Sequence, residues 1–522
     1  MAELSTYAVA ELDAVGLPGM TLCIVDAEGF TATLGLGWAD IENRTRVNAK
    51  QMFQIGSISK SFIALAILAL ADKGKIDLDA SISHYLPEAP LPEAPITVIQ
   101  LLNHTSGLAH DAPMFPRGGD GRLWTGFPPG AKFSYSNIGF NLLGRIVERV
   151  TGNPHQFAVD RLVRDKLSIA TMAGVISDPK RPGFAVGYWP WDNAHEQIPG
   201  ARLERALWSE EDIPAGSVAA TAEQMAVYVS ALIQLGRGVG SPVLSDAMAR
   251  RFATGAVDSS EDFGPGSQYA CGVAVQPVDG APCLHHTGGM MSFSSSFHAD
   301  PVTGIGCFAS VNARLGSYRP RLTTAYAIRL MRAVRRGRPL PPPPDPLAPW
   351  RIKDPAPYLG SFYTEETEIV LTRSRDGIMF SSDDTTGKVM AIGKDRLAND
   401  NPEFSRYAFD AIREDGQVTG FWVGEELFAR DRPRPPPARL ASLARFGGAY
   451  LNRDPWVGSA VVHVRGDRLY LEGGGWLVER GGGWWSLETD PGGVERFRFD
   501  AMLNGKTTRL NASGFDLTRI SV

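Results

Sequence analysis

Residues 56–73 read GSISKSFIALAILALADK, and within them residues 62–71 form the longest apolar run of the chain. After Gly56 the segment has no internal glycine or proline, is rich in alanine, leucine and isoleucine, and ends before Gly74. These features predict a helix. Because it would be apolar almost all round, we expect this helix to be buried inside a domain. A membrane-spanning helix needs about 20 apolar residues, so no membrane span is predicted.

The same segment carries two polar residues whose spacing suits chemistry. Ser57 and Lys60 lie three residues apart, so they face one side of the predicted helix. The positive end of the helix favours negative charge at the serine, and a lysine against a buried helix favours its neutral, proton-accepting form. The alternative is that Ser57 only caps the helix. The spacing recurs at Ser177 and Lys180, where Pro179 predicts a turn instead.

A second motif, Tyr135-Ser136-Asn137, precedes a predicted helix over residues 137–150. The pKa of a phenol beside an ammonium falls, so Tyr135 can carry a proton to a leaving group. The Asn137 amide can hold a substrate amide and the lysine together. The alternative is that Tyr135 is a loop aromatic with a buried ring and a solvated hydroxyl.

A third motif, HHTGG at residues 285–289, begins at the end of a strand-like stretch. Neighbouring strand residues face opposite sides, so His285 and His286 cannot chelate one metal ion together. The two glycines let a substrate carbonyl approach the backbone closely. Other histidines, including His104 and His110, are too scattered for metal-ligand spacing and are interpreted as structural. No metal and no cofactor is predicted.

The composition narrows the class of protein. The chain has 522 residues, of which 43% are hydrophobic and 21% charged, so it can bury several cores. It has 52 basic and 57 acidic side chains and a formal net charge of -5, which argues against nucleic-acid binding. Four cysteines without a CxxC pair predict buried thiols rather than disulfides or a zinc site. The first residues do not resemble a signal peptide. We therefore expect a cytoplasmic protein, or a periplasmic or secreted one if a leader was removed.

Proline marks the expected domain boundaries. Residues 338–346 and 432–437 are proline-rich and should form stiff, extended connectors. They divide the chain into domains over residues 1–337, 338–432 and 433–522. The first domain opens with a predicted hairpin, continues with helices and ends with strands, which indicates a sheet closed by both ends of the domain.

The two tail domains repeat each other. Residues 358–363 match residues 446–451 at an offset of 88, and residues 406–412 match residues 496–502 at an offset of 90. Both copies have short alternating stretches broken by glycine and aspartate. Two duplicated antiparallel β-barrels are therefore predicted.

The three motifs occur in one order along the chain, and that order resembles the serine β-lactamase and penicillin-recognising family. Its closest members are class C β-lactamases, D-alanyl carboxypeptidases and D-aminopeptidases. The connecting segments LLNHTSGL at 101–108 and PAGS at 214–217 look alike too. The resemblance implies an α+β fold over residues 5–337, in which an antiparallel sheet is flanked by helices and a cleft separates it from a helical lobe.

Carried over residue by residue, the resemblance implies roles for the motifs. Ser57 resembles the acylated nucleophile, Lys60 its activator, and Tyr135 the general acid/base. Substrate binding would fall to Asn137, His286, Thr287 and Gly288, and the oxyanion hole to the backbone N–H groups of Ser57 and Gly289. One residue departs from the pattern: His286 stands where most members carry a lysine that binds a substrate carboxylate. Histidine followed by Thr-Gly is similar to the bacterial D-aminopeptidase.

That D-aminopeptidase also has two C-terminal eight-stranded barrels, and a loop of the second reaches its active site. Here the corresponding candidate loop contains Glu472, Trp476 and Glu479, with glycines that favour mobility. Its acidic side chains could meet a substrate ammonium. The alternative is a solvent-exposed hairpin tip.

The sequence thus predicts a serine hydrolase that works through an acyl-enzyme. The favoured activity is that of an aminopeptidase or amidase on short peptides or amino-acid amides, with D-configured substrates as one option. An esterase or a β-lactamase-like hydrolase on the same core is the first alternative, and a non-catalytic penicillin-binding-like protein the second. A homodimer is compatible with the sequence.

Overall fold

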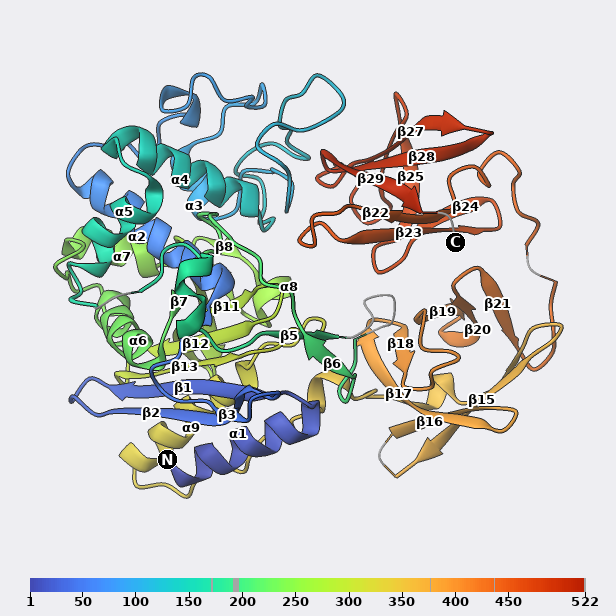
Figure 1. The fold of residues 1–522 in the computed structure, drawn as a ribbon, viewed down its shortest axis with the longest axis horizontal. Helices are drawn as coiled ribbons and strands as arrows, with labels where there is room; N and C mark the ends of the chain where they lie inside the picture. Colours follow the sequence, from blue (N-terminus) through green and yellow to red (C-terminus); the bar gives the residue numbers. More distant parts are fainter. Residues whose placement is uncertain (170–171, 191–196, 376, 436, 521–522) are drawn as a thin grey trace. The chain divides into compact units, whose positions relative to one another are not determined.

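The computed structural model describes residues 1–169, 172–190, 197–375, 377–435 and 437–520 (Figure 1). The chain forms two compact units. The first contains residues 1–189 and 204–344, and the second contains residues 190–203 and 345–522. Within the described ranges, no helix is both long enough and apolar enough to cross a lipid bilayer.

An antiparallel sheet forms the centre of the first unit. Over the described residues it has nine strands in the order β3-β2-β1-β13-β12-β11-β10-β9-β8. The strands are β1 (Gly19–Asp26), β2 (Thr31–Asp40), β3 (Thr45–Arg46), β8 (Val257–Asp258), β9 (Gln268–Tyr269), β10 (Ala274–Val278), β11 (Ala281–Gly289), β12 (Ser294–Asp300) and β13 (Ile305–Val311). β1 and β2 form the predicted N-terminal hairpin, and β1 pairs with β13, with Ile24 opposite Cys307. Both ends of the domain therefore close the sheet, as predicted.

Helices cover both faces of this sheet. They are α1 (Ala2–Val15), α2 (Ser59–Asp72), α3 (Val98–Leu102), α4 (Asn137–Thr151), α5 (His155–Val159), α6 (Ala222–Gly236), α7 (Asp246–Ala253), α8 (Ser260–Phe263) and α9 (Arg321–Arg335). On β13, Gly306 lies against Val229 of α6, whereas its neighbour Ile305 packs with Ile328 of α9. Because neighbouring strand residues face opposite sides, α6 and α9 cover opposite faces. Two short strand pairs, β4 (Phe53–Gln54) with β7 (Ala219–Ala220) and β5 (Tyr188–Pro190) with β6 (Leu203–Arg205), lie outside the sheet.

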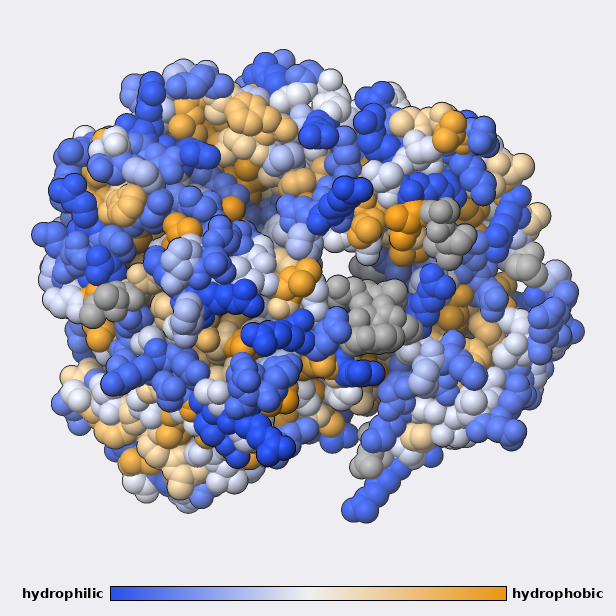
Figure 2. Space-filling view, in the orientation of Figure 1, coloured by the Kyte–Doolittle hydropathy of each residue, from blue (hydrophilic) through white to orange (hydrophobic). Residues whose placement is uncertain are grey.

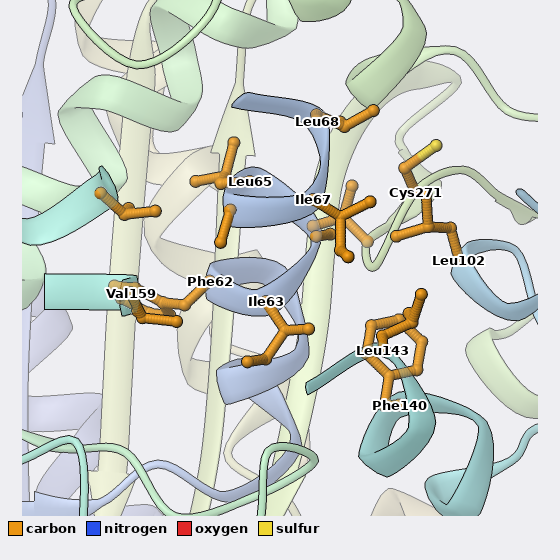
Figure 3. Packing of buried hydrophobic residues seen from close by; sticks show 14 of the residues in the cluster. Phe62, Ile63, Leu65, Ile67, Leu68, Leu102, Phe140, Leu143, Val159 and Cys271 are labelled. Atoms are coloured by element: carbon orange, nitrogen blue, oxygen red, sulfur yellow. The ribbon is translucent and has the colours of Figure 1, made fainter. Parts of the chain in front are cut away.

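The predicted apolar helix is α2, and it is buried on every side. All residues from Ser59 to Leu70 are buried. Its side chains radiate toward the surrounding helices, as Figure 3 shows for Phe62, Ile63 and Leu65. The Phe62 ring stacks on Tyr228 of α6 with centroids 3.9 Å apart. A turn of 3-10 helix over Gly56–Ile58 leads into α2, so Ser57 lies just before the first full turn.

The second unit contains two closed antiparallel barrels, as predicted. In the described part of the chain each has eight strands. The first is built from β14 (Gly360–Tyr363), β15 (Glu368–Ser374), β16 (Gly377–Ser382), β17 (Thr385–Gly393), β18 (Arg396–Asn399), β19 (Phe409–Glu414), β20 (Gln417–Val423) and β21 (Glu426–Arg430). The second is built from β22 (Gly448–Leu451), β23 (Ser459–Arg465), β24 (Arg468–Leu471), β25 (Gly475–Gly481), β26 (Trp484–Leu487), β27 (Phe497–Leu503), β28 (Lys506–Ala512) and β29 (Phe515–Ile520).

The strands also explain the two repeat offsets. β14 and β22 begin 88 residues apart, and so do β19 and β27, although the matched letters near β19 lie 90 apart. A slip of two residues keeps each side chain on the same face of a strand, so the inside-outside pattern survives it.

Both connectors lack regular structure where they are described. Residues 338–346 form neither helix nor strand, and the same holds for residues 432–435 and 437. Residue 436 of the second connector lies outside the described residues. All four cysteines are buried and unpaired, as predicted. On the face drawn in Figure 2, hydrophilic and apolar residues are interspersed, which is ordinary for a folded protein surface.

Candidate active site

Lys60 lies at the centre of the candidate site and is fully buried. Its Nζ is 3.0 Å from Ser57 Oγ, 2.6 Å from Asn137 Oδ1 and 3.0 Å from the Ala215 carbonyl oxygen. The amide and carbonyl oxygens can only accept hydrogen bonds. A neutral amine therefore spends its two N–H bonds on them and turns its lone pair toward the Ser57 hydroxyl. The structure thus brings the predicted serine, lysine and asparagine into direct contact.

The environment of Lys60 favours that neutral form. Burial lowers the pKa of Lys60 to about 7, and the charge of Asp111 opposes part of this effect. The three contacting acceptors carry no formal charge, so none of them holds the proton as strongly as a carboxylate would. Near neutral pH, Lys60 can therefore act as a base.

Tyr135 borders Lys60 through its ring. The Lys60 Nζ lies 4.9 Å from the centroid of the Tyr135 ring. The His104 ring packs on Tyr135, with ring centroids 4.2 Å apart. The Tyr135 hydroxyl is buried and has no hydrogen bond of regular geometry with the described residues. The sequence predicts that a neighbouring ammonium lowers the pKa of Tyr135, but burial raises it, and the neighbouring Ser57 hydroxyl lowers it only in part. The buried Tyr135 hydroxyl therefore lies beside the Ser57 hydroxyl, where it can meet a substrate bound at that residue.

The loop before α4 explains how Tyr135 and Asn137 are held. Ser136 caps α4, because its Oγ accepts from the Gly139 N–H at 3.1 Å and donates to the Ala109 carbonyl at 2.7 Å. The Ser136 N–H donates to His104 Nδ1 at 3.0 Å. His104 is buried, its pKa is lowered by that burial, and it therefore serves as a neutral support. The structural interpretation of His104 is thus consistent with its surroundings.

Glycines bring the turn that carries Ser57 against the end of β11. Gly56 has a φ of 55°, and a Cβ at this position would lie 2.6 Å from the Gly289 backbone nitrogen. A Cβ at Gly288 would collide with the Ile55 carbonyl oxygen. The Ser295 hydroxyl adds a hydrogen bond of 2.7 Å to that carbonyl. The two segments that carry the expected oxyanion N–H groups, those of Ser57 and Gly289, are therefore in backbone contact.

His286 faces the cluster around Tyr135, while His285 faces the other side of β11. His286 Nδ1 lies 2.6 Å from the Thr287 carbonyl oxygen, which can only accept, so Nδ1 carries the proton. Its Nε2 then accepts from the Tyr269 hydroxyl at 3.0 Å. Burial lowers the pKa of His286 to about 3, with the nearby Lys60 charge acting in the same direction. His286 is therefore neutral, and both of its nitrogens are engaged within the protein.

Positive charge instead comes from the segment before and at the start of α9, which sequence reasoning did not single out. A Cβ at Gly289 would collide with the Arg319 guanidinium, and Arg321 Nη2 lies 3.5 Å from Thr287 Oγ1. Both arginines are half-buried. Burial lowers the pKa of Arg319 to about 9, and the charges of Arg314 and Arg321 act the same way. Among the described residues, no carboxylate forms an ion pair with Arg319. Both guanidinium groups thus place positive charge beside Gly289 and Thr287.

Asp111 and Ala215 are further neighbours that the motifs did not indicate. The Asn137 amide donates to both carboxylate oxygens of Asp111, at 3.0 and 3.1 Å. The Ala215 carbonyl belongs to the PAGS segment, and its N–H donates to Asn141 Oδ1 at 3.1 Å. In the sequence, the PAGS segment and residues 101–108, which lead toward Asp111, stood out only as segments similar to those of a family. No local pattern showed that the Ala215 carbonyl contacts Lys60 or that Asp111 is linked to Lys60 through Asn137.

The expected gating loop is a tight hairpin in the second barrel. Glu472 follows β24, and its carboxylate accepts from His463 Nε2 at 2.8 Å and pairs with Arg396. Trp476 packs on Tyr470, with ring centroids 5.2 Å apart. Glu479 is exposed on β25. Glu472 thus already has an arginine and a histidine as partners in its own unit. A gating role for Glu472, Trp476 and Glu479 stays a prediction.

Comparisons with known proteins point in one direction. A family model described as Beta-lactamase matches residues 6–330. Esterase EstB of Burkholderia gladioli is 34% identical over 180 residues, which cover 29% of this chain and 45% of the esterase. The chain thus spans less than half of that relative. Penicillin-binding protein 4 of Amycolatopsis lactamdurans is 28% identical over 375 residues, which cover 67% of this chain and 94% of that protein.

A solved structure extends the likeness in fold. The octameric penicillin-binding protein homologue from Pyrococcus abyssi superimposes with a TM-score of 0.59 at 18% identity, covering 92% of this chain and 98% of that one. At this identity the match concerns the fold alone.

Proposed function

The chain belongs to the beta-lactamase family of serine hydrolases, and on this premise we propose that it hydrolyses short peptides or amino-acid amides through an acyl-enzyme on Ser57. One observation carries the proposal. The buried Lys60 amine lies 3.0 Å from Ser57 Oγ and gives its other two contacts to oxygens that can only accept. This arrangement directs the lone pair of the neutral amine at the serine proton.

The reaction proceeds in two stages. Ser57 Oγ attacks the substrate carbonyl carbon while its proton passes to Lys60, and the backbone N–H groups of Ser57 and Gly289 stabilise the oxyanion. When the C–N bond breaks, Tyr135 gives its proton to the departing amine and recovers one from Lys60. Water then attacks the ester on Ser57, loses a proton to the same pair of residues, and releases the acid and the free serine.

Charge in the site indicates which substrates fit. Arg319 and Arg321 present positive charge beside Gly289 and Thr287, whereas His286 is neutral and has no free N–H. We therefore expect a substrate that carries a carboxylate near the scissile bond, as the terminal residue of a short peptide does. The aminopeptidase form of the proposal rests on the similarity of the His-Thr-Gly motif and of the two barrels to D-aminopeptidase, and it requires the free amine to point away from the arginines.

An esterase is the second candidate, and the likeness to esterase EstB favours it. The same acyl-enzyme chemistry applies, and an alkoxide leaves more readily than an amine. Weak ester hydrolysis therefore accompanies either function, and the ratio of amide to ester turnover separates them.

The test measures p-nitroaniline release from D-alanyl- and L-alanyl-p-nitroanilide, each with and without an N-acetyl group, beside hydrolysis of p-nitrophenyl acetate and of the dipeptide D-Ala-D-Ala. Amide or dipeptide turnover that is lost in Ser57→Ala supports the proposal. The matched control is Ser177→Ala, because Ser177 stands in the second serine–lysine spacing, on a turn before Asp178–Gly183. Turnover of the ester alone would favour the esterase, and full turnover by Ser57→Ala would overturn both.

A further inference from the structure

A chain of hydrogen bonds runs from the proposed base to the protein surface. Lys60 Nζ donates to Asn137 Oδ1 at 2.6 Å, and Asn137 Nδ2 donates to the Asp111 carboxylate at 3.0 and 3.1 Å. Asp111 Oδ2 in turn lies 2.8 Å from His110 Nδ1. His110 is exposed and Asp111 is half-buried, so the chain leads from a fully buried amine to solvent in three steps.

The middle of this chain constrains the Asn137 amide. An amide has an accepting and a donating end, and only the oxygen can receive a hydrogen bond from Lys60. The Nδ2 group then needs an acceptor, and the Asp111 carboxylate supplies two oxygens that accept and cannot donate when charged. A rotated amide would aim Nδ2 at Lys60 and Oδ1 at a carboxylate, which is repulsive at both ends. Asp111 therefore determines which end of the amide faces Lys60.

Asp111 is itself held in place and kept charged. Burial alone would raise the pKa of Asp111, but hydrogen bonds from His110 and Asn137, together with the charges of His110 and Lys60, lower it overall. The backbone adds a tie, because the Asn137 N–H donates to the His110 carbonyl oxygen at 2.7 Å. The carboxylate thus lies one amide away from Lys60, close enough to act on its charge without contacting it.

We propose that Asp111 is a positioning residue for the hydrolysis, which orients the Asn137 amide on Lys60 and stabilises the charge that Lys60 acquires when it accepts the serine proton. This inference rests on the proposed function, since it assigns Lys60 the role of base. Asp111 contacts neither the nucleophile nor the expected position of the substrate carbonyl, so it acts through Asn137.

The other ionisable groups around Lys60 do not duplicate this role. They come from the segments packed about α2 and are His104, Tyr135, His286 and, beyond Tyr135, Arg319. Burial lowers the pKa of both His104 and His286, so these imidazoles stay neutral, and it raises the pKa of Tyr135, so the phenol stays neutral. Arg319 carries the same sign of charge as Lys60. The negative charge that supports protonated Lys60 therefore comes from Asp111.

Removing that charge has a predicted sign. In Asp111→Asn the ammonium form of Lys60 loses its nearby anion, so the pKa of Lys60 falls. The acidic limb, which is the low-pH part of the profile of Ser57 labelling rate against pH, then moves to lower pH. Because Asp111 is partly solvated, we expect a shift of about half a pH unit. On the plateau the rate falls about tenfold, since an asparagine no longer forces one orientation of the Asn137 amide. Asp111→Glu keeps the charge and should keep the position of the limb while lowering the plateau.

The experiment measures the rate at which a fluorophosphonate adds mass to Ser57 in the full-length chain between pH 5 and 9. Asp120→Asn is the matched control, because it removes an exposed aspartate from the same loop that does not act on Lys60. A limb shifted in Asp111→Asn but not in Asp111→Glu or Asp120→Asn supports the proposal. An unshifted limb with an unchanged plateau in Asp111→Asn overturns it.

Two further outcomes are an Asp111→Asn variant that does not fold and a wild-type chain that does not label. If Asp111→Asn does not fold, His110→Gln replaces it, because His110 is exposed and the loss of its hydrogen bond should loosen Asp111 and slow labelling about threefold. Unchanged labelling in His110→Gln would then overturn the proposal. Failure of the wild-type chain to label at Ser57 would overturn the proposed function and this inference with it. Normal wild-type labelling, together with an unchanged rate and pH profile in Asp111→Asn, would overturn the inference alone.

Discussion

Two buried cations in this protein have opposite surroundings. Lys60, in the first unit, is fully buried and contacts only uncharged oxygens. Arg465, in the second barrel, is just as deeply buried, but its guanidinium pairs with the Asp410 carboxylate at 2.9 Å and donates to the Gly424 carbonyl at 2.7 Å. It also stacks on the Tyr470 ring, with the centroid 3.7 Å away.

The difference shows that the partners of a buried cation decide whether it can exchange a proton or only stabilises the fold. A direct carboxylate partner stabilises the charged form of a cation and so holds it as a structural tie. Uncharged acceptors satisfy the hydrogen bonds of an amine without fixing its proton. Lys60 can therefore change its charge. Arg465 keeps a permanent charge, which joins the second barrel to Asp410 of the first. Four experiments test this contrast.

The largest effect is expected from Lys60→Met, which removes the amine and keeps an apolar chain of similar length. Loss of a general base should lower the rate of Ser57 acylation by about 10²–10⁴-fold. The measurement is fluorophosphonate labelling followed by intact mass. Lys75→Met is the matched control, because Lys75 is exposed just beyond α2 and should label at the wild-type rate. Wild-type labelling of Lys60→Met would show that the amine has no chemical role.

Arg465→Ala tests the structural cation. Removing Arg465 leaves the buried Asp410 carboxylate to the more distant Arg396, 3.7 Å away, and we expect the second unit to lose about 3 kcal/mol of unfolding free energy. Chemical denaturation followed by tryptophan fluorescence measures this loss. Arg468→Ala breaks the solvent-exposed pair with Glu488 in the same barrel, so its cost should stay below about 1 kcal/mol. Equal costs for the two variants would remove the distinction between buried and exposed pairs here.

The charge change of Lys60 should be visible in the pH dependence of the wild-type chain. Burial lowers the pKa of Lys60 to about 7, and the base acts only when neutral. Labelling of Ser57 should therefore level off above pH 7 and fall about tenfold per pH unit below it. Burial also raises the pKa of Glu11, on α1, to about 7. Glu11→Gln identifies the titrating group: an acidic limb that persists in this variant belongs to Lys60, and a limb that disappears belongs to Glu11.

A smaller effect is expected at Arg319, a cation whose partners differ from those of both Lys60 and Arg465. Arg319 donates to the Tyr318 carbonyl oxygen, and in the described part of the chain no carboxylate forms an ion pair with it. The proposed mechanism gives it no part in proton transfer. Arg319→Met should lower kcat/KM for a carboxylate-bearing dipeptide about tenfold, as loss of a charged hydrogen bond does, and leave p-nitrophenyl acetate hydrolysis unchanged. Arg329→Met, on the helix α9 that follows Arg319 and paired with Asp279, should change neither rate. An equal loss on both substrates in Arg319→Met would indicate damage to the oxyanion site instead.

Much of the fold could be read from local patterns. The apolar run of residues 62–71 is α2, the hairpin near the N-terminus is β1 with β2, and the repeat of the tails is a pair of barrels. Helix period, strand alternation and turn residues are properties of neighbours in the chain, and burial selects them directly. The residue types and order of the three motifs were likewise enough to identify a family.

The site was predicted less completely. Ser57, Lys60 and Asn137 were expected together and do meet. The expectation that His286 binds substrate stays a prediction, and the structure shows its two nitrogens hydrogen-bonded to Tyr269 and Thr287. The identity of a histidine does not reveal its hydrogen-bond partners, because these come from other strands and turns.

The sequence by itself determined that Ser57 and Lys60 face one side of the helical segment that leads into α2, because a spacing of three residues is about one helical turn. Only the tertiary structure decided that the Asn137 amide donates to Asp111 and that Arg319 lies against Gly289. These contacts join segments that no local period relates. They form because glycines permit close backbone approach and because a buried polar group must find a partner wherever packing places one.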